Sequence, residues 1–127
     1  MGNLPTFGTA ASKDVGTGAG QIPDMSAWTS NNGTGSGWRK SPDGTLVNFG
    51  YASAPTAGPV SITFPAAFPN GIRSVSITPV VPSPSGTDSP TIGTYNNSGM
   101  TVNRRNSSAG GAANNASWDF FWTIEGH

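Results

Sequence analysis

Regular alternation of apolar and polar residues is the clearest pattern in the chain, and it is confined to residues 37–127. The stretches VSITF and SVSITPVV each place apolar side chains on one side and Ser or Thr on the other. The stretch SWDFFWTIE does the same, with Trp118, Phe120, Trp122 and Ile124 on one side. Successive side chains of a strand point to opposite faces, so all three stretches are predicted strands. The aromatic side of the last one is predicted core.

Turn-forming residues separate these strands at short intervals. Pro42-Asp43-Gly44 lies between GWRK and TLVNFGY, and Asn96-Asn97-Ser98-Gly99 lies between TIGTY and MTVNR. Both are predicted hairpins, because Pro presets the backbone for a turn and Gly accepts a positive φ. The prolines at 79, 82, 84 and 90 argue against a central strand, so 82–90 is a predicted loop. We therefore expect an all-β fold, an antiparallel β-sandwich of about seven to eight strands.

Residues 1–36 differ from the rest, because they have few large apolar side chains and no sustained period. This segment cannot bury a core alone, so it is either disordered or packed against another surface, such as a copy of itself. Its glycine-rich stretch DVGTGAGQIPDM (14–25) raises the question of a phosphate-binding loop. Such a loop needs a buried strand before it and a long helix after it, and the flanking residues predict neither. We interpret the stretch as a joint.

The composition narrows the classes of function. Six Lys and Arg balance six Asp and Glu, so the chain offers no basic field for nucleic acid. There is no cysteine, which excludes disulfides and thiolate metal sites. No apolar run approaches the ~20 residues that span a bilayer. No charged segment followed by an apolar core begins the chain, so we expect no signal peptide and synthesis in the cytoplasm.

Residues suited to catalysis or metal binding are scarce. The single histidine, His127, is the last residue, and it is a candidate metal ligand only if three copies meet in a trimer. The acidic residues show no catalytic spacing, and Asp43 is explained by its turn. We therefore predict no enzyme activity and no cofactor, although folding can bring two carboxylates together.

Several aromatic and polar residues are candidate ligand contacts. Trp28 and Trp38 lie among Gly and Ser, so each is either a sugar-stacking platform or an interface anchor. Arg104 and Arg105 are adjacent and point to opposite sides of a strand, so an exposed one can donate hydrogen bonds to an anionic sugar. The candidate binding residues are Trp38, Tyr51, Asp88, Arg104, Arg105, Asn106 and Asn114.

Several stretches together resemble the tail-fibre proteins of phages and prophages. GTAASKDVGTGAGQIPDM resembles the linker ahead of the fibre tip. GWRKSPDGTLVNFGYA, VSITFPAAFPNGIRSVSITP, GMTVNR and SWDFFWTIEGH resemble the C-terminal tip domain. The most specific part is the pair Phe64-Pro65 and Phe68-Pro69-Asn70. On this basis residues 1–36 are a shaft-to-tip linker and residues 37–127 are the tip domain.

The resemblance implies a homotrimer at the distal tip of a tail fibre, in a phage, prophage or R-type tailocin particle. Its task would be to bind a bacterial surface receptor, either lipopolysaccharide or another surface glycan. In such a trimer we expect Ile22, Met25 and Trp28 to contact the other chains. Two other functions stay open: a depolymerase that cleaves surface glycans, and a purely structural fibre or baseplate piece.

The order and direction of the strands decide at which end of the sandwich each loop or turn lies. If successive strands are antiparallel, one end carries the long segments 52–59, 82–90 and 105–116. The other end then carries the turns at 41–44, 65–73 and 96–99 and the C-terminus. We favour the long segments as the receptor-binding ones. The N-terminal segment is expected to enter on their side, which is the wrong side for a fibre shaft.

Overall fold

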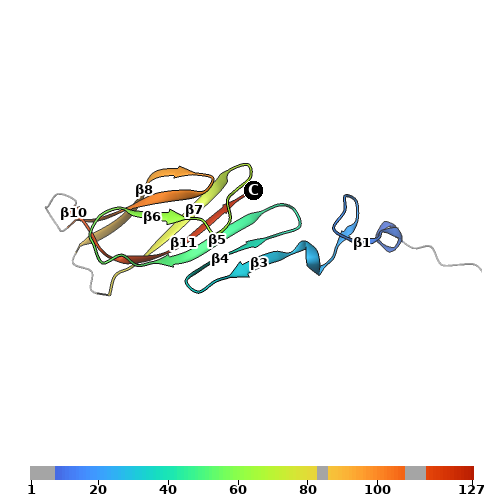
Figure 1. Cartoon of the computed structure of the whole chain (residues 1–127), viewed down its shortest axis with the longest axis horizontal. Coiled ribbons are helices and arrows are strands. Elements are labelled where there is room, and N and C mark those ends of the chain that lie inside the picture. The colour runs from blue at the N-terminus through green and yellow to red at the C-terminus, as the bar shows by residue number, and fades with distance from the viewer. Residues whose placement is uncertain (1–7, 83–85, 108–113) are drawn as a thin grey trace, which may run out of the picture.

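Two antiparallel sheets face one another and form a β-sandwich (Figure 1). The computed structural model describes residues 8–82, 86–107 and 114–127. One sheet has the strand order β3 (Thr29–Asn32), β4 (Ser36–Lys40), β5 (Leu46–Ala52), β11 (Asp119–Gly126) and β7 (Ile72–Val80). The other is centred on β9 (Gly99–Ser107), flanked on one side by β8 (Thr87–Asn96) and on the other by β6 (Val60–Thr63) and β10 (Asn114–Asn115). The predicted all-β sandwich is confirmed.

The core lies between the sheets, on the faces that the alternation predicted. In β11, Phe120, Trp122 and Ile124 are buried, whereas Phe121, Thr123 and Glu125 are exposed. The other buried apolar side chains are Leu46, Ile62, Phe64, Phe68, Met100, Val102 and Trp118. Burying each large apolar side chain contributes about 1.5–3 kcal/mol, so this layer is the main stabilising element of the sandwich.

A buried asparagine joins the first sheet to the segment that follows β6. Asn48 is fully buried; its Nδ2 donates to the Ala66 carbonyl at 2.9 Å and its Oδ1 accepts from the Ala66 N–H at 2.9 Å. Asn48→Ala leaves both backbone groups unpaired, so we expect the free energy of unfolding in urea to fall by about 1–3 kcal/mol. Asn31→Ala, on the exposed strand β3, is the matched control and should cost less than about 0.5 kcal/mol. Equal losses in the two variants would contradict this role.

Both predicted hairpins are confirmed. Between β4 and β5, the Gly44 N–H donates to the Ser41 carbonyl at 3.0 Å, and Gly44 has a φ of 88° that other residues rarely adopt. Between β8 and β9, Asn96 Oδ1 accepts from the N–H groups of Ser98 and Gly99. The turn residues singled out in the sequence therefore make the backbone contacts that close each hairpin.

The predicted long loops are shorter than expected, which corrects their boundaries. Pro79 lies in β7 and Pro90 in β8. Each of these is an edge strand of the described sheets, where a residue without an N–H removes no ladder bond. β8 therefore begins at Thr87, inside the predicted loop 82–90. Likewise β9 and β10 take up both sides of the predicted loop 105–116. The remaining positions 83–85 and 108–113 lie outside the described residues.

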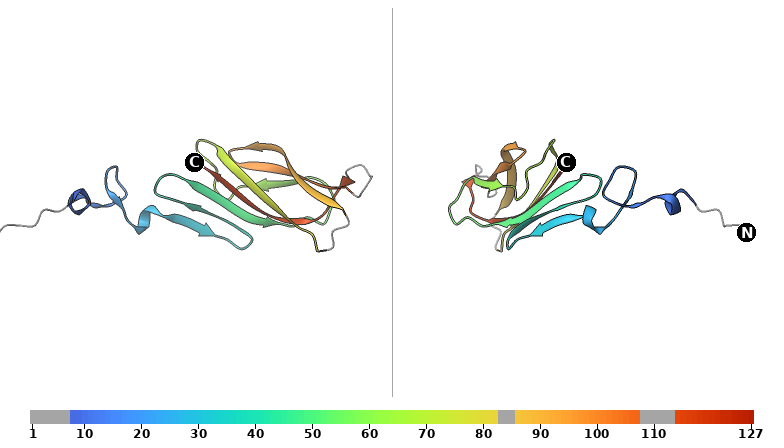
Figure 2. Two further views of the ribbon diagram at one scale, coloured as in Figure 1. Left: turned by 180° about the vertical axis from the view of Figure 1, so that it is seen from behind. Right: turned by 45° about the vertical axis from the view of Figure 1, so that its right-hand side comes forward.

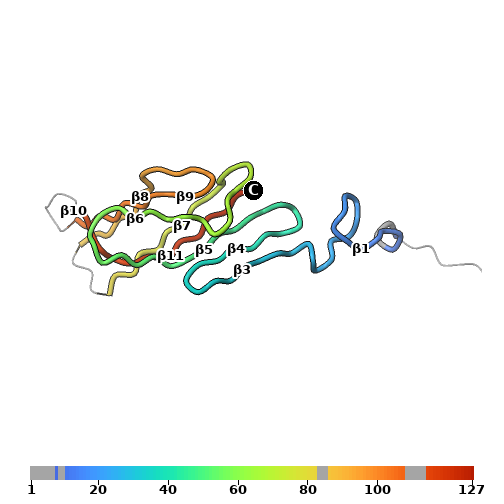
Figure 3. Tube along the Cα trace, viewed as in Figure 1, coloured from blue at the N-terminus to red at the C-terminus, as the bar shows by residue number. Residues whose placement is uncertain are grey.

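The N-terminal segment holds short elements before the first sheet begins. They are the 3-10 turns η1 (Thr9–Ser12) and η2 (Met25–Ala27) and the paired two-residue strands β1 (Val15–Gly16) and β2 (Ile22–Pro23) (Figure 3). Gln21 fills the space beside the glycines of the joint. Its Oε1 accepts from the Gly18 N–H at 2.6 Å, and a Cβ at Gly16 would lie 2.6 Å from the same oxygen. These glycines therefore make room for the Gln21 side chain, and the interpretation of the stretch as a joint stays a prediction.

The direction in which the N-terminal segment enters corrects the expectation from sequence. Thr29 of β3 pairs with Lys40 of β4, and Lys40 pairs with Leu46, next to the β4–β5 turn. Because β3 runs antiparallel to β4, the chain arrives at the end that carries the short turns (Figures 1 and 2). The residues of β3, TSNN, include no apolar side chain, so alternation could not reveal this strand.

The two ends of the sandwich are named here by what they carry. The turn end holds the β4–β5 and β8–β9 turns, the C-terminus and the entry of the N-terminal segment. The loop end is opposite, where β5, β7 and β9 end and β8 begins. The long segments that we favoured for binding are therefore at the end away from the N-terminal segment, and the difficulty with a fibre shaft disappears.

Candidate ligand-binding site

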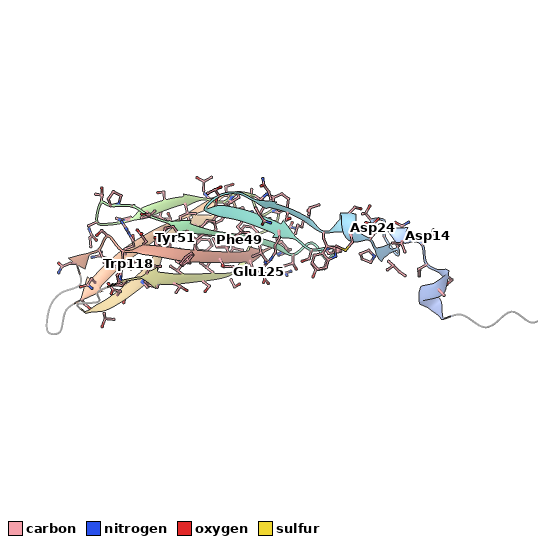
Figure 4. All side chains as sticks on the ribbon, turned by 90° about the horizontal axis from the view of Figure 1, so that it is seen from below. Asp14, Asp24, Phe49, Tyr51, Trp118 and Glu125 are labelled. Atoms are coloured by element: carbon pink, nitrogen blue, oxygen red, sulfur yellow. The ribbon has the colours of Figure 1, made fainter. Side chains whose placement is uncertain are left out.

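A cavity of about 680 Å³ opens at the loop end, between the ends of the two sheets. Its lining residues are Tyr51, Val80, Val81, Pro82, Asp88, Asn106, Asn114, Asn115, Ala116, Ser117, Trp118 and Asp119. Figure 4 shows Trp118 and Tyr51 toward this end and Asp14 and Asp24 on the N-terminal segment at the other. Four of the seven candidate binding residues, Tyr51, Asp88, Asn106 and Asn114, line this cavity.

One wall of the cavity is a row of polar residues across three neighbouring strands. Asn106 of β9 pairs with Asp88 of β8 on one side and with Asn114 of β10 on the other. The Asn106 Nδ2 donates to Asp88 Oδ1 at 2.8 Å, which fixes the orientation of both side chains. The row thus presents a carboxylate and amide groups in register, and these both donate and accept hydrogen bonds.

The opposite wall carries a tyrosine held by an aspartate. The Tyr51 hydroxyl of β5 donates to Asp119 Oδ2 at the start of β11. This bond, followed by one from Ser53, lowers the pKa of Asp119, and the same Tyr51–Asp119 bond raises the pKa of Tyr51. The Tyr51 ring also packs against Phe121, with centroids 4.9 Å apart. At neutral pH this wall therefore combines a charged acceptor with an aromatic surface.

The lowered pKa of Asp119 gives a prediction for the acid side of the binding profile. A carboxyl whose folded pKa lies below the ordinary 3.8 stays ionised down to that value and protonates only as the pH falls further. We therefore expect the midpoint of the Asp119 titration to lie below pH 3.8, so that the carboxylate is mainly ionised at pH 3.8 and above. A carbon-13 NMR titration of the Asp119 side chain measures this directly. A titration midpoint at or above pH 3.8 would contradict the assignment.

Arg104 does not line the cavity and is fully buried rather than exposed to a ligand. Its Nε donates to the Gly58 carbonyl at 3.0 Å, and its Nη1 donates to the Ala54 and Trp118 carbonyls at 3.0 and 2.9 Å. Its Nη2 donates to the Thr56 carbonyl at 2.5 Å. Four of its five N–H groups thus hold main-chain carbonyls. Arg104 joins the 53–59 segment to the strand that supplies Asp119.

The remaining candidate binding residues do not line the cavity. Arg105 is exposed, as expected for one of the adjacent arginines, because its side chain leaves the opposite face of β9 from Arg104. Trp38 is half-buried on β4 and packs against the core. It pairs with Asn31 and Asn48, away from the strand ends that form the cavity.

The expected interchain contacts lie on the N-terminal segment. Ile22, Met25 and Trp28 are exposed in the single chain, with 38%, 83% and 57% of their surfaces accessible. His127 is tied to the turn end, where its N–H donates to the Gly71 carbonyl at 3.1 Å. Among the described residues no three His, Cys, Asp or Glu side chains are grouped to hold a metal ion.

Asp119 is the charged residue among the cavity residues that sequence reasoning missed. It stands at the first position of the last strand, just before the alternating aromatic core residues. A polar residue at a strand end that faces the long segments was the available signal, because such positions gather at one end of a sandwich. Tyr51 is the last residue but one of β5, and the two meet because β5 and β11 are neighbours.

The comparisons with known proteins point to one family. Residues 40–127 match the family described as "Putative tail fiber protein gp53-like, C-terminal". A comparison with curated protein sequences returned no match. In the described part of the chain, no helix is both long and apolar enough to cross a membrane.

Solved structures with a similar fold are pyocin tail fibres. An N-truncated R2-type pyocin tail fibre matches with a TM-score of 0.61 and 20% identity, over 79% of this chain and 37% of that one. The C-terminal part of a P. aeruginosa R2 pyocin fibre gives the same TM-score and identity, over 26% of its length. An N-truncated R1-type pyocin tail fibre has a TM-score of 0.59 and 20% identity, and 85% of it is covered. This chain thus spans little more than a third of the first structure and about a quarter of the second.

Proposed function

The chain belongs to the gp53-like family of putative tail fibre proteins, and we propose that it attaches its particle to a bacterial surface glycan through the loop end. The observation that carries the proposal is the placement of the cavity. It opens at the end of the sandwich opposite the N-terminal segment. If that segment continues a fibre shaft, the loop end is the distal surface, which meets the cell first.

The chemistry of the cavity suits a saccharide. Asp88, Asn106 and Asn114 form a row of hydrogen-bonding groups, and Tyr51 adds an aromatic face beside them. Saccharides offer many hydroxyl groups and one apolar ring face, so they bind such mixed surfaces. Lipopolysaccharide is the surface glycan that we favour, in keeping with the tail-fibre family.

A trimer would strengthen a shallow site of this kind. Three sites on one rigid tip make the second and third contacts effectively intramolecular, so avidity exceeds the affinity of each site. The exposed Ile22, Met25 and Trp28 are the proposed contacts between chains. Large exposed apolar side chains on an extended segment are typical of surfaces that another chain covers.

Binding to bacteria with stepwise truncations of their surface polysaccharide tests the proposal. The labelled protein should bind a susceptible strain and lose binding when the truncation removes its receptor sugar. Unchanged binding to every truncated strain would exclude a polysaccharide receptor. Absence of binding to any bacterium would favour the purely structural fibre piece.

A glycan-cleaving activity is the second candidate, because the cavity brings two carboxylates, Asp88 and Asp119, to one site. Glycosidases use such a pair, one of which must be a general acid with a raised pKa. The pKa of Asp119 is lowered, so Asp119 is unsuited to be the acid of such a pair. We propose binding without cleavage. Release of reducing ends from surface polysaccharide by the purified protein would overturn this choice.

A further inference from the structure

The charge of the cavity wall indicates which kind of ligand the cavity binds. This inference rests on the proposed function. The described residues that line the cavity include two carboxylates, Asp88 and Asp119, and no Lys or Arg. The chain as a whole has a net charge of zero, so this local excess of negative charge is a property of the site.

Neither nearby arginine offers a hydrogen bond to a ligand in the cavity. Four N–H groups of the buried Arg104 donate to the carbonyls of Ala54, Thr56, Gly58 and Trp118. Arg105 is exposed, but it does not line the cavity. The donors that the described wall presents are therefore neutral groups, such as the side-chain amides of Asn106 and Asn114.

Carboxylates in this position act as acceptors. Asp88 already accepts from the Asn106 amide and Asp119 from the Tyr51 hydroxyl, and these bonds fix the two side chains. A carboxylate can accept about four hydrogen bonds, so each retains capacity for hydroxyl groups of a ligand. A phosphate or carboxylate of a ligand cannot donate to them and is repelled at contact distance.

An aromatic surface continues from the cavity along the outer face of the first sheet. Tyr51 and Phe121 pack together with an angle of 56° between their rings, and 40% and 56% of their surfaces are exposed. Tyr51 belongs to both surfaces, because its hydroxyl reaches Asp119 while its ring contacts Phe121. A pyranose ring held by the carboxylates can thus place an apolar face on this pair.

We propose that the loop-end cavity selects a saccharide without anionic groups, either neutral or amino-bearing, and rejects phosphorylated and carboxylated sugars. Hydroxyl or ammonium groups of the ligand donate to Asp88 and Asp119, and its ring packs on Tyr51 and Phe121. This replaces the idea of an arginine that binds an anionic sugar.

The test uses a strain that the full chain binds. Its surface polysaccharide is partly hydrolysed and separated by anion exchange into an unretained fraction and a retained, anionic fraction. Each fraction then competes with the cells for the labelled protein. We expect the unretained fraction to inhibit binding and the retained one to be at least tenfold weaker.

Variants identify the residues responsible. Asp88→Asn with Asp119→Asn should lower inhibition by the unretained fraction about tenfold and narrow its advantage over the retained one. Asp88→Asn alone leaves the Tyr51–Asp119 bond in place. It should change the inhibition and the ratio between the two fractions in the same direction, but less than the double variant does. Glu125 is an exposed acid of β11 near the turn end. Glu125→Gln also removes one negative charge, and it should change neither the inhibition nor the ratio between the two fractions.

The outcomes separate this inference from the proposed function. Stronger inhibition by the retained fraction, inhibition by neither fraction, or an unchanged ratio in the double variant would each overturn the inference while attachment stands. A protein that binds no bacterium would remove the proposed function and the inference together. A thermal melt of each variant shows that its sandwich is intact.

Discussion

Arg104→Ala is expected to lower the free energy of unfolding by about 4 kcal/mol, among the larger effects of a single substitution. The change removes the donors for four main-chain carbonyls and leaves a cavity where a fully buried side chain had been. Each buried carbonyl left without a partner costs about 1–3 kcal/mol, although water entering from the loop end offsets part of this. Urea denaturation of the full chain measures the loss.

Arg105→Ala is the matched control for this prediction. Arg105 is the next residue of the same strand, carries the same charge and is exposed, so we expect a change within about 0.5 kcal/mol. Arg104→Lys should be intermediate, because an ammonium group has three donors at one point and cannot reach four separated carbonyls. An Arg104→Ala protein as stable as Arg105→Ala would show that the guanidinium does not hold the 53–59 segment.

Removal of residues 1–28 is expected to convert a trimer into a folded monomer and to lower apparent affinity for cells by about 10²–10⁴-fold. The deletion removes Ile22, Met25 and Trp28 but keeps β3, which pairs with β4. A deletion to residue 36 would expose the edge of β4 and confuse loss of assembly with loss of fold. Light scattering gives the mass, and binding to a susceptible strain gives the affinity.

A matched variant separates the effect of losing the apolar contacts from the effect of shortening the segment. Met25→Ser with Trp28→Ser keeps the chain intact and should weaken the trimer in the same direction. Asp24→Asn retains a side-chain acceptor for the Ser26 N–H and should leave the mass near three chains. A full-length protein that is a monomer at micromolar concentration, or a trimer that survives the deletion, would contradict the role given to residues 1–28.

The sandwich could be predicted where apolar residues alternate or turn residues are distinctive. The aromatic residues of β11 and the Gly44 turn are examples, because strand periodicity and positive φ depend on local chemistry. β3 could not be predicted in the same way. Its residues are all polar and exposed, and it exists because β4 offers an unpaired edge. Because of this one strand, the chain enters the sandwich at the end opposite to the one expected from the sequence.

The candidate site was also predicted only in part, because local patterns reveal some of its residues and not others. Asp88, Asn106 and Asn114 were visible as polar residues beside long segments, and the register of three strands brings them together. Arg104 looked like a ligand contact because charge in a strand is usually exposed. Its burial depends on carbonyls of residues 54–58, about 50 positions earlier in the chain, which no local pattern encodes.

A bulky group placed at either end of the sandwich tests most directly whether the loop end binds the cell. The chain has no cysteine, so a single one can carry a maleimide-linked polyethylene glycol. Ser117→Cys puts it at the cavity and Ser98→Cys puts it in the β8–β9 turn, and both serines are exposed. We predict that the polymer at position 117 abolishes binding to a susceptible strain and that the polymer at position 98 does not. Binding blocked from position 98 and retained at position 117 would contradict the account.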